Sequence, residues 1–324
     1  MKGTILTAVS ALALSASAVL ADGSITVYTA APQNFIDALV PVFEKSSGTK
    51  VEIIKAGSGE LLNRLTAEKA KPQADVLWSV DGTVVDFNPD LFEPYTAKDS
   101  DKLAETVKHS ELWTPFTAVV TAFVVNESKL DGKPVPTSWE ALADPQYKGL
   151  ISSARVDNSG SAYITMALIM QIFGDEKGME IYKAQLGNYS LSESSGAVAR
   201  FVNDGELPIG IANEDGALRY VEGGGPVKII YPSEGTAIAP DAMALIKGGP
   251  NAEQGKAFID FMLSQEGQTI VAEQGRRPVR ADVASKPALT PMGEFKSANY
   301  DAKAAAAKRE ELVTAWKDML LDAQ

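Results

Sequence analysis

The hydrophobic pattern of the first third of the chain switches between the period of a strand and that of a helix. Residues 25–28 are all β-branched or aromatic, which predicts a strand, and the apolar positions Phe35, Leu39 and Phe43 follow at helical spacing. Further strands are predicted at 51–54 and 75–78, with a helix that carries Leu61, Leu62 and Leu65 between them. Strands that alternate with helices indicate crossover units and a largely parallel sheet.

A second series of strands and helices follows the turn-rich segment 132–136. It opens with a strand at 149–152 and with a helix after the turn Asn158-Ser159-Gly160-Ser161. Strands are then predicted at 189–192, 208–212, 227–231 and 242–246, and helices at 252–263, 265–273 and 302–321. No short repeat period is present, which excludes a solenoid.

Two long apolar strands, at 118–125 and 240–246, connect the two series. A chain that crosses twice between two α/β units has the plan of a hinged receptor. We therefore expect an α/β protein of two lobes. The predicted boundaries are 22–120 and 242–285 for lobe 1, and 121–241 and 286–324 for lobe 2.

The N-terminus has the features of a secretory signal peptide. Lys2 precedes a run of apolar and small residues, and Val19-Leu20-Ala21 predicts cleavage after Ala21, so that residues 1–21 are removed. No later segment approaches the length of about 18 apolar residues that suits a membrane span. The chain has no cysteine, so we expect neither a lipid anchor nor disulfides, but a soluble monomer in a Gram-negative periplasm.

The charge and the histidine count exclude several function classes. The formal net charge is −12, and loss of one lysine with the leader makes it −13, which argues against nucleic acid as a partner. His109 is the only histidine, which argues against a Ser-His-Asp catalytic triad and excludes a metal site with several histidine ligands. We expect no enzyme, although residue counts leave hydrolysis by two carboxylates open.

Three turns that contain serine lie between a predicted strand and a predicted helix: Gly57-Ser58-Gly59, the turn 158–161 and Ser194-Ser195-Gly196. Helix N-termini offer unpaired N–H groups, so hydroxyls placed there favour phosphate or carboxylate. The alternative is that these serines only cap their helices. Because open α/β sheets bind ligands at strand carboxyl ends, we expect one shared anion site with Ser58, Ser161 and Ser195.

Acidic and polar residues at other strand ends are candidates for the rest of the site. Glu214 and Asp215 follow the strand at 208–212, and Glu234 follows the strand at 227–231. Their carboxylates suit hydroxyls or an amine, although the first two are also typical first-turn acids of a helix. Thr29 and Asp81 end the first and third strands and are possible neighbours.

The one basic cluster contains Arg276, Arg277 and Arg280. We interpret it as a solvated loop rather than as a source of cations for a bound anion. Whether these arginines contact a ligand stays open.

Several short motifs resemble one known family in the same order along the chain. They are ITVY at 25–28, GSGEL at 57–61, ADVLW at 74–78, GELPI at 205–209, YPSEGT at 231–236, AFIDF at 257–261 and RPVRAD at 277–282. The chain resembles the bacterial extracellular solute-binding proteins related to ferric-iron, phosphonate and sugar-phosphate receptors of ABC importers. The resemblance implies the two-lobed type II fold with mixed sheets and a two-strand hinge, no cofactor, and a cognate ABC permease as partner.

The resemblance also bears on the ligand. Ferric-binding members carry a histidine, a glutamate and a tyrosine pair where this chain has Pro32, Gly59, Glu214 and Asp215. Iron prefers hard anionic oxygen ligands, so Fe(III) is the weaker alternative, as is a polyamine or thiamine receptor suggested by acidic charge. The resemblance implies a small phosphorylated solute, either a sugar phosphate or an aminophosphonate, held by Thr29, Ser58, Asp81, Ser161, Ser195, Glu214, Asp215 and Glu234.

Overall fold

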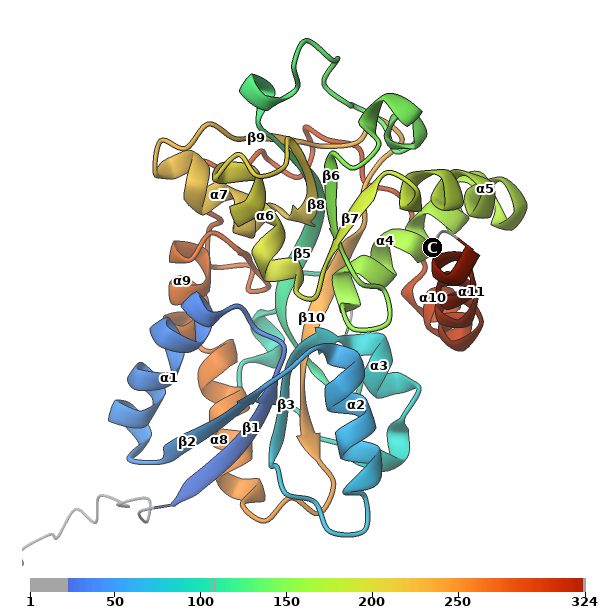
Figure 1. Cartoon of the computed structure of the whole chain (residues 1–324). Coiled ribbons are helices and arrows are strands. Elements are labelled where there is room, and N and C mark those ends of the chain that lie inside the picture. The colour runs from blue at the N-terminus through green and yellow to red at the C-terminus, as the bar shows by residue number, and fades with distance from the viewer. Residues whose placement is uncertain (1–22, 106, 108, 323–324) are drawn as a thin grey trace, which may run out of the picture.

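The computed structural model describes residues 23–105, 107 and 109–322, so the predicted leader 1–21 lies outside the described residues (Figure 1). The strands are β1 (Ser24–Thr29), β2 (Lys50–Lys55), β3 (Val76–Asp81), β4 (Phe92–Glu93), β5 (Thr114–Val125), β6 (Ile151–Ala154), β7 (Tyr189–Ser192), β8 (Ile209–Asn213), β9 (Lys228–Ile230), β10 (Ile238–Ile246) and β11 (Arg277–Pro278). The helices are α1 (Gln33–Ser47), α2 (Ser58–Ala67), α3 (Gly82–Asp86), α4 (Gly160–Phe173), α5 (Asp175–Leu186), α6 (Ser195–Asn203), α7 (Glu214–Glu222), α8 (Ala252–Leu263), α9 (Gln265–Glu273), α10 (Ala302–Ala307) and α11 (Arg309–Asp322). Short 3₁₀ helices lie at Pro89–Leu91, Ser100–Lys102, Glu127–Lys129, Glu140–Ala143 and Pro145–Tyr147. Within these described ranges, no helix has the length and apolar character that crossing a membrane requires.

The strands form one mixed sheet in the order β2-β1-β3-β10-β5-β8-β6-β7. Pairs β1–β2, β1–β3, β6–β7 and β6–β8 are parallel, whereas β10 runs antiparallel to β3 and β5, and β5 antiparallel to β8. Helices connect these parallel strands along the chain, with α1 and α2 joining β1, β2 and β3, and α4, α5 and α6 joining β6, β7 and β8, as the alternating pattern of the sequence predicts. The predicted α/β class with mixed sheets is therefore confirmed.

The two long strands β5 and β10 join the lower and upper halves of the molecule in Figure 1. Residues 114–120 of β5 pair with β10, and residues 121–125 pair with β8. These strands contain the predicted crossing segments 118–125 and 240–246. The exact lobe boundaries given above stay a prediction.

In the lower half, helices cover both faces of the sheet. On one face, Phe35, Leu39 and Phe43 of α1 pack with Phe258 of α8 and with Trp78 of β3 in one core. On the other face, α2 and α3 pack against the same strands through a second core. The α1 helix ends at Gly48, whose φ of 73° suits glycine and stops the helix before β2 begins.

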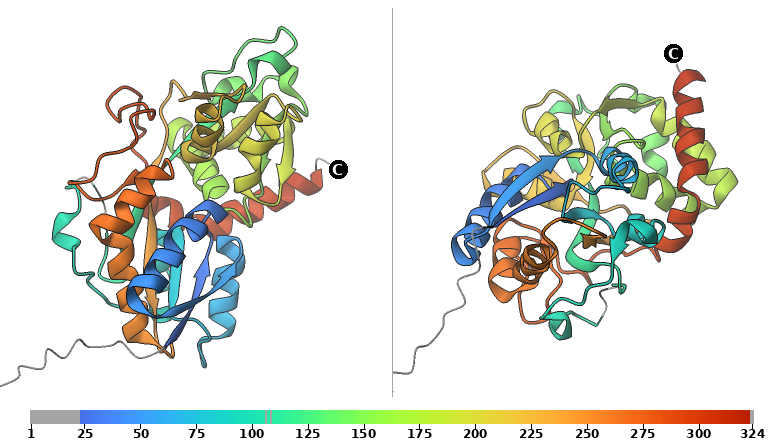
Figure 2. Two further views of the ribbon diagram at one scale, coloured as in Figure 1. Left: turned by 90° about the vertical axis from the view of Figure 1, so that its left-hand side faces the viewer. Right: turned by 90° about the horizontal axis from the view of Figure 1, so that it is seen from below.

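In the upper half, α4, α5 and α11 cover one face of the sheet, and α6 and α7 cover the other (Figures 1 and 2). The predicted single helix at 302–321 is wrong, because the chain breaks between α10 and α11 at Lys308. The carbonyl of Ala305 accepts hydrogen bonds from the Tyr163 hydroxyl and from Lys308 N, which replace the bond that would continue the helix. The break lets α10 contact both α3 and α4.

Candidate functional site

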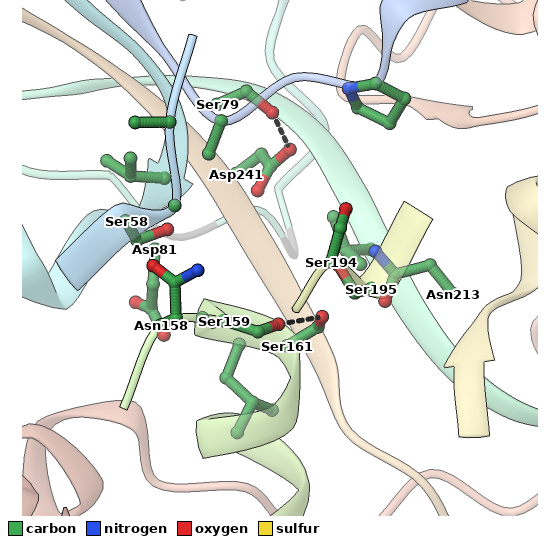
Figure 3. A pocket seen from close by; sticks show the side chains of 18 of the residues that line it. Ser58, Ser79, Asp81, Asn158, Ser159, Ser161, Ser194, Ser195, Asn213 and Asp241 are labelled. Atoms are coloured by element: carbon green, nitrogen blue, oxygen red, sulfur yellow. Dashed lines mark hydrogen bonds between the residues drawn. The ribbon is translucent and has the colours of Figure 1, made fainter. Parts of the chain in front are cut away.

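A cavity of about 350 Å³ lies where the carboxyl ends of strands from both halves meet (Figure 3). The residues after β1, β2, β6 and β7 contribute to its wall, together with the last residues of β3 and β8 and with Asp241 in the middle of β10. This is the edge at which open α/β sheets bind ligands. Of the predicted site residues, Ser58, Asp81, Ser161 and Ser195 line the cavity.

Three helices begin at this cavity with serines whose hydroxyls are not used as caps. Ser159 caps α4 by accepting from Ala162 N at 3.3 Å, and Ser194 caps α6 by accepting from Gly196 N at 3.3 Å. Among the described residues, the Ser161 hydroxyl hydrogen-bonds only the Ser159 hydroxyl, at 3.1 Å between the oxygens, and no described residue hydrogen-bonds the Ser195 hydroxyl. Capping therefore explains Ser159 and Ser194, but it does not explain Ser161 or Ser195.

The start of α2 contributes the third serine. Its N-cap is Gly57, which has no side chain to cap with, and the hydroxyl of the buried Ser58 has no hydrogen-bond partner within the described ranges. Ser58, Ser161 and Ser195 thus bring hydroxyls from both halves of the molecule to one cavity, beside the positive ends of three helices (Figure 3).

The turn before α2 touches the turn before α4 directly across the cavity rim. A Cβ atom at Gly57 would lie 2.4 Å from the backbone oxygen of Asn158, and one at Gly59 would lie 2.6 Å from the backbone oxygen of Asp157. Side chains cannot approach a backbone that closely, so both glycines are required for this contact. Neither has a positive φ, so close approach is the reason for glycine here.

The wall opposite the upper-half serines is acidic. Asp241 accepts from the Ser79 hydroxyl at 2.6 Å and from Arg276 Nη1 at 2.8 Å, and both bonds use its Oδ2 atom. Ser79 has a φ of 61°, which is uncommon for a residue with a side chain and is held here by its surroundings. Burial raises the pKa of Asp241, while Arg276 and Ser79 act in the opposite direction. The Oδ1 atom of Asp241 makes no hydrogen bond to any described residue, so it is available to a ligand.

Asp81, the last residue of β3, lines the same cavity. Its Oδ1 atom accepts from Thr83 N at 2.8 Å and from the Thr83 hydroxyl at 2.7 Å, which caps α3. Burial raises the pKa of Asp81, and the hydrogen bonds from Thr83 oppose the shift. Asp81 is therefore partly engaged by its own helix, whereas Asp241 points a free oxygen at the cavity.

The interpretation of the arginine cluster as a solvated loop is wrong. Arg276, Arg277 and Arg280 are only 3%, 4% and 6% exposed. Arg276 Nη2 lies 2.9 Å from Asp215 Oδ2, and Arg277 holds both oxygens of Glu214 at 2.6 and 3.0 Å. Buried arginines need such partners, and these lie 61 and 63 residues earlier in the chain. Of the three arginines, only Arg276 lines the cavity.

Four predicted ligand contacts are not brought to the cavity. Glu214 and Asp215 are buried against the arginines, and Glu214 also accepts from the Tyr231 hydroxyl at 2.6 Å. Burial raises the pKa of Glu214, and Arg277 opposes this shift. Glu234 accepts from Glu140 N at 3.1 Å, and the Thr29 hydroxyl donates to Trp78 O at 2.9 Å. These residues support the architecture around the site rather than its surface.

Sequence reasoning missed several lining residues, of which Asp241, Ser79 and Asn213 matter most. Asp241 was detectable as the only acid within the second crossing strand, and Ser79 as a polar residue between Trp78 and Asp81 at a strand end. Asn213 ends β8, directly before Glu214 and Asp215, which the sequence pattern favoured as ligand contacts.

Metal ligands are not assembled at the site. Among residues 23–105, 107 and 109–322, no group of three or more His, Cys, Asp or Glu side chains could hold a metal ion. Pro32 lines the cavity without a donor side chain, and Glu214 and Asp215 are paired with arginines.

Comparison with known proteins identifies the family. Residues 71–304 match the bacterial extracellular solute-binding protein family. The chain is 28% identical to the putative 2-aminoethylphosphonate-binding periplasmic protein of Salmonella typhi over 302 residues, which cover 87% of each chain. It is 26% identical to the Fe(3+)-binding periplasmic protein of Serratia marcescens, over 90% of this chain and 89% of that protein.

A solved structure agrees with this assignment. The periplasmic binding protein AfuA from Actinobacillus pleuropneumoniae, with exogenous fructose-6-phosphate bound, matches with a TM-score of 0.87 and 26% identity. The match covers 92% of this chain and 98% of that one. The predicted type II binding-protein fold is thereby confirmed, and the chain belongs to the bacterial extracellular solute-binding protein family.

Proposed function

We propose that this protein is the periplasmic solute-binding component of an ABC importer and that it binds a small phosphorylated solute in the 350 Å³ cavity. The observation that carries the proposal is the convergence of Ser58, Ser161 and Ser195 at the starts of α2, α4 and α6. Backbone N–H groups and hydroxyls at helix N-termini suit a tetrahedral anion. Two relatives named above, one with a phosphonate in its name and one with a sugar phosphate bound, support this ligand class.

The other end of the solute lies against the acidic wall. The free oxygen of Asp241 suits an ammonium group or a sugar hydroxyl, and Asp81 is its acidic neighbour along the wall. The solute is therefore bipolar, with an anionic phosphoryl end toward the serines and a donor end toward Asp241.

Capture proceeds by closure of the two lobes about β5 and β10. A ligand that contacts both halves binds the closed form more tightly than the open one, so occupancy shifts the hinge equilibrium. The closed form presents a surface that the open form lacks, so a membrane permease can distinguish the loaded protein from the empty one. The direct contact of Gly57 and Gly59 with the turn before α4 is a closed-form contact.

A thermal-shift screen tests the ligand class. We expect 2-aminoethylphosphonate or a sugar phosphate to raise the melting temperature, since ligand at a hundred times its Kd adds about 2.7 kcal/mol to stability. Polyamines, thiamine and Fe(III) are the comparison ligands. Stabilisation by one of these, with no response to any phosphorylated compound, would reject the proposal.

Replacing Ser58 or Ser195 by alanine should weaken binding by about 1.5–3 kcal/mol each, as for hydrogen bonds to a charged group. Calorimetry with the ligand found by the screen measures this loss. Ser190→Ala is the matched control, because Ser190 is an exposed serine on β7 outside the cavity lining. If Ser58→Ala and Ser195→Ala bind with the same affinity as Ser190→Ala, the anion does not bind at these two serines.

The Asp241→Asn variant separates the two solute classes. An aminophosphonate would lose a charged partner for its ammonium group, so we expect its affinity to fall by more than that of a sugar phosphate. Asp215→Asn is the control, because Asp215 is also a carboxylate partner of Arg276 but does not line the cavity. If the Asp241→Asn and Asp215→Asn proteins bind the ligand with equal affinity, Asp241 does not contact the ligand.

Export is tested separately from binding. We expect the protein recovered from a periplasmic extract to begin at Asp22 by mass spectrometry and to elute as a monomer. A retained N-terminal segment would contradict the predicted leader without affecting the ligand proposal.

A further inference from the structure

A second cavity, of about 10 Å³, lies directly behind the wall that bears the upper-half serines. It shares Ser161, Ser195 and Asn213 with the main cavity, and its other polar lining residues are Thr121, Ser153 and Thr165. A cavity of this size is just large enough to hold one water molecule. The cavity is thus a small polar chamber beneath the proposed anion site.

Three polar groups at this chamber lack hydrogen-bond partners within the described part of the chain. The Oδ1 atom of Asn213 is buried without a partner. Thr121 and Ser153 are only 3% and 5% exposed, and no described residue hydrogen-bonds their hydroxyls. By contrast, the Thr165 hydroxyl donates to Ser161 O at 3.0 Å. Buried polar groups are rarely left unpaired, because each costs free energy when it has no partner.

We infer that one ordered water occupies this chamber and fixes the side chain of Asn213 as a ligand-binding donor. The water donates to Asn213 Oδ1 and exchanges hydrogen bonds with the Thr121 and Ser153 hydroxyls. These three partners match the usual number for a buried water. When the water holds Asn213 Oδ1 on the chamber side, Asn213 Nδ2 faces the main cavity, which Asn213 also lines.

The position of Asn213 supports this role. Figure 3 shows it on the same side of the main cavity as Ser194 and Ser195, at the end of β8. Its Nδ2 has no hydrogen-bond partner among the residues that the structure describes. That Asn213 Nδ2 contacts the ligand rests on the proposed function. Its N–H would complete the set of hydrogen-bond donors around a phosphoryl group. Thr121 and Ser153 act through the water and are positioning residues.

A high-resolution crystal structure of the protein tests the water directly. We expect one ordered water within hydrogen-bond distance of Asn213, Thr121 and Ser153, with or without ligand. A chamber that is clearly empty in a well-resolved map, or one filled by a rotated side chain, would overturn the inference. This test does not depend on which solute binds.

Calorimetry with 2-aminoethylphosphonate and fructose 6-phosphate tests the positioning role. Thr121→Val combined with Ser153→Ala should weaken binding by roughly tenfold, and Asn213→Asp by more, because a carboxylate would face the anion. The matched control combines Thr117→Val and Ser152→Ala. Both control residues are buried on the same strands, with unpaired hydroxyls, and neither lines either cavity.

The outcomes separate the two proposals. Circular dichroism confirms that each variant is folded before its affinity is read. If the test pair binds as tightly as the control pair, the positioning role is overturned even where the water is present. If the water is present but neither compound binds the unmodified protein, the phosphorylated ligand class fails and the water site stands.

Discussion

Alanine at Gly57 or Gly59 is expected to hold the cleft open and to weaken ligand binding by about a hundredfold, because only a small fraction of the protein could then reach the closed form. A Cβ atom at either position would lie 2.4–2.6 Å from backbone oxygens of residues 157 and 158. A backbone cannot rotate aside as a side chain can, so the two turns must separate. Small-angle scattering with saturating ligand should show a larger radius of gyration than the unmodified protein shows.

The control for this prediction is Gly196→Ala. Gly196 also lies in the first turn of a helix that starts at the cavity, but a Cβ atom there would meet only the Ser194 hydroxyl, at an ordinary 3.5 Å. We expect it to close and bind as the unmodified protein does. Unchanged affinity and full compaction in the Gly57→Ala and Gly59→Ala proteins would show that the contact between the turns is not needed for closure.

Replacing Arg277 by methionine is expected to lower the free energy of unfolding by about 3–5 kcal/mol, the usual cost of removing one partner from a buried ion pair. Glu214 is 2% exposed and would keep only its bond from the Tyr231 hydroxyl. Chemical denaturation followed by circular dichroism measures the loss. Arg200→Met is the comparison, because Arg200 pairs with exposed acids at the surface and should shift the melting temperature little.

The loss should grow with pH. Burial already raises the pKa of Glu214 in the folded protein, and removing the Arg277 charge, which opposes that shift, raises it further. Between the unfolded and folded pKa values the folded state binds more protons, so the free energy of unfolding falls as pH rises through that window. The destabilisation should therefore be smaller near the unfolded pKa of Glu214 than at neutral pH.

The double variant Arg277→Met, Glu214→Gln distinguishes a lost charge pair from lost packing. It should recover part of the stability and lose the pH dependence, because no buried carboxylate is left without a partner. If the Arg277→Met protein is as stable as the unmodified protein at all pH values, the Arg277–Glu214 pair contributes nothing to the free energy of unfolding.

Local patterns were sufficient to predict most elements of the fold. The helices α8 and α9 lie where the amphipathic segments 252–263 and 265–273 were predicted, because the spacing of apolar residues is read within one element. Ser58, Ser161 and Ser195 were predicted for a similar reason. A serine beside glycine between a strand and a helix is a local signal, and the strand order then brings such turns to one edge.

The roles of the charged residues could not be predicted in this way. Arg276 pairs with Asp241 and Asp215, which lie 35 and 61 residues earlier, and no local pattern reports such distant partners. Without them, the arginines resemble a surface loop, and Glu214 and Asp215 resemble free acids at a helix start. The chamber behind Asn213 depends on how β5, β6 and β8 pack together, so it too had no local signal.

The lower half of the molecule is assembled from distant parts of the chain, which affects the order of its folding. Strand β3 is completed by β10, and Trp78 is buried against Phe258. The first hundred or so residues therefore cannot bury their main core until residues beyond 240 are available. Contacts between segments so far apart form slowly, because a long loop must close first. For a chain exported as proposed above, this delay is useful, since it prolongs the time in which the polypeptide is unfolded and can be threaded across a membrane.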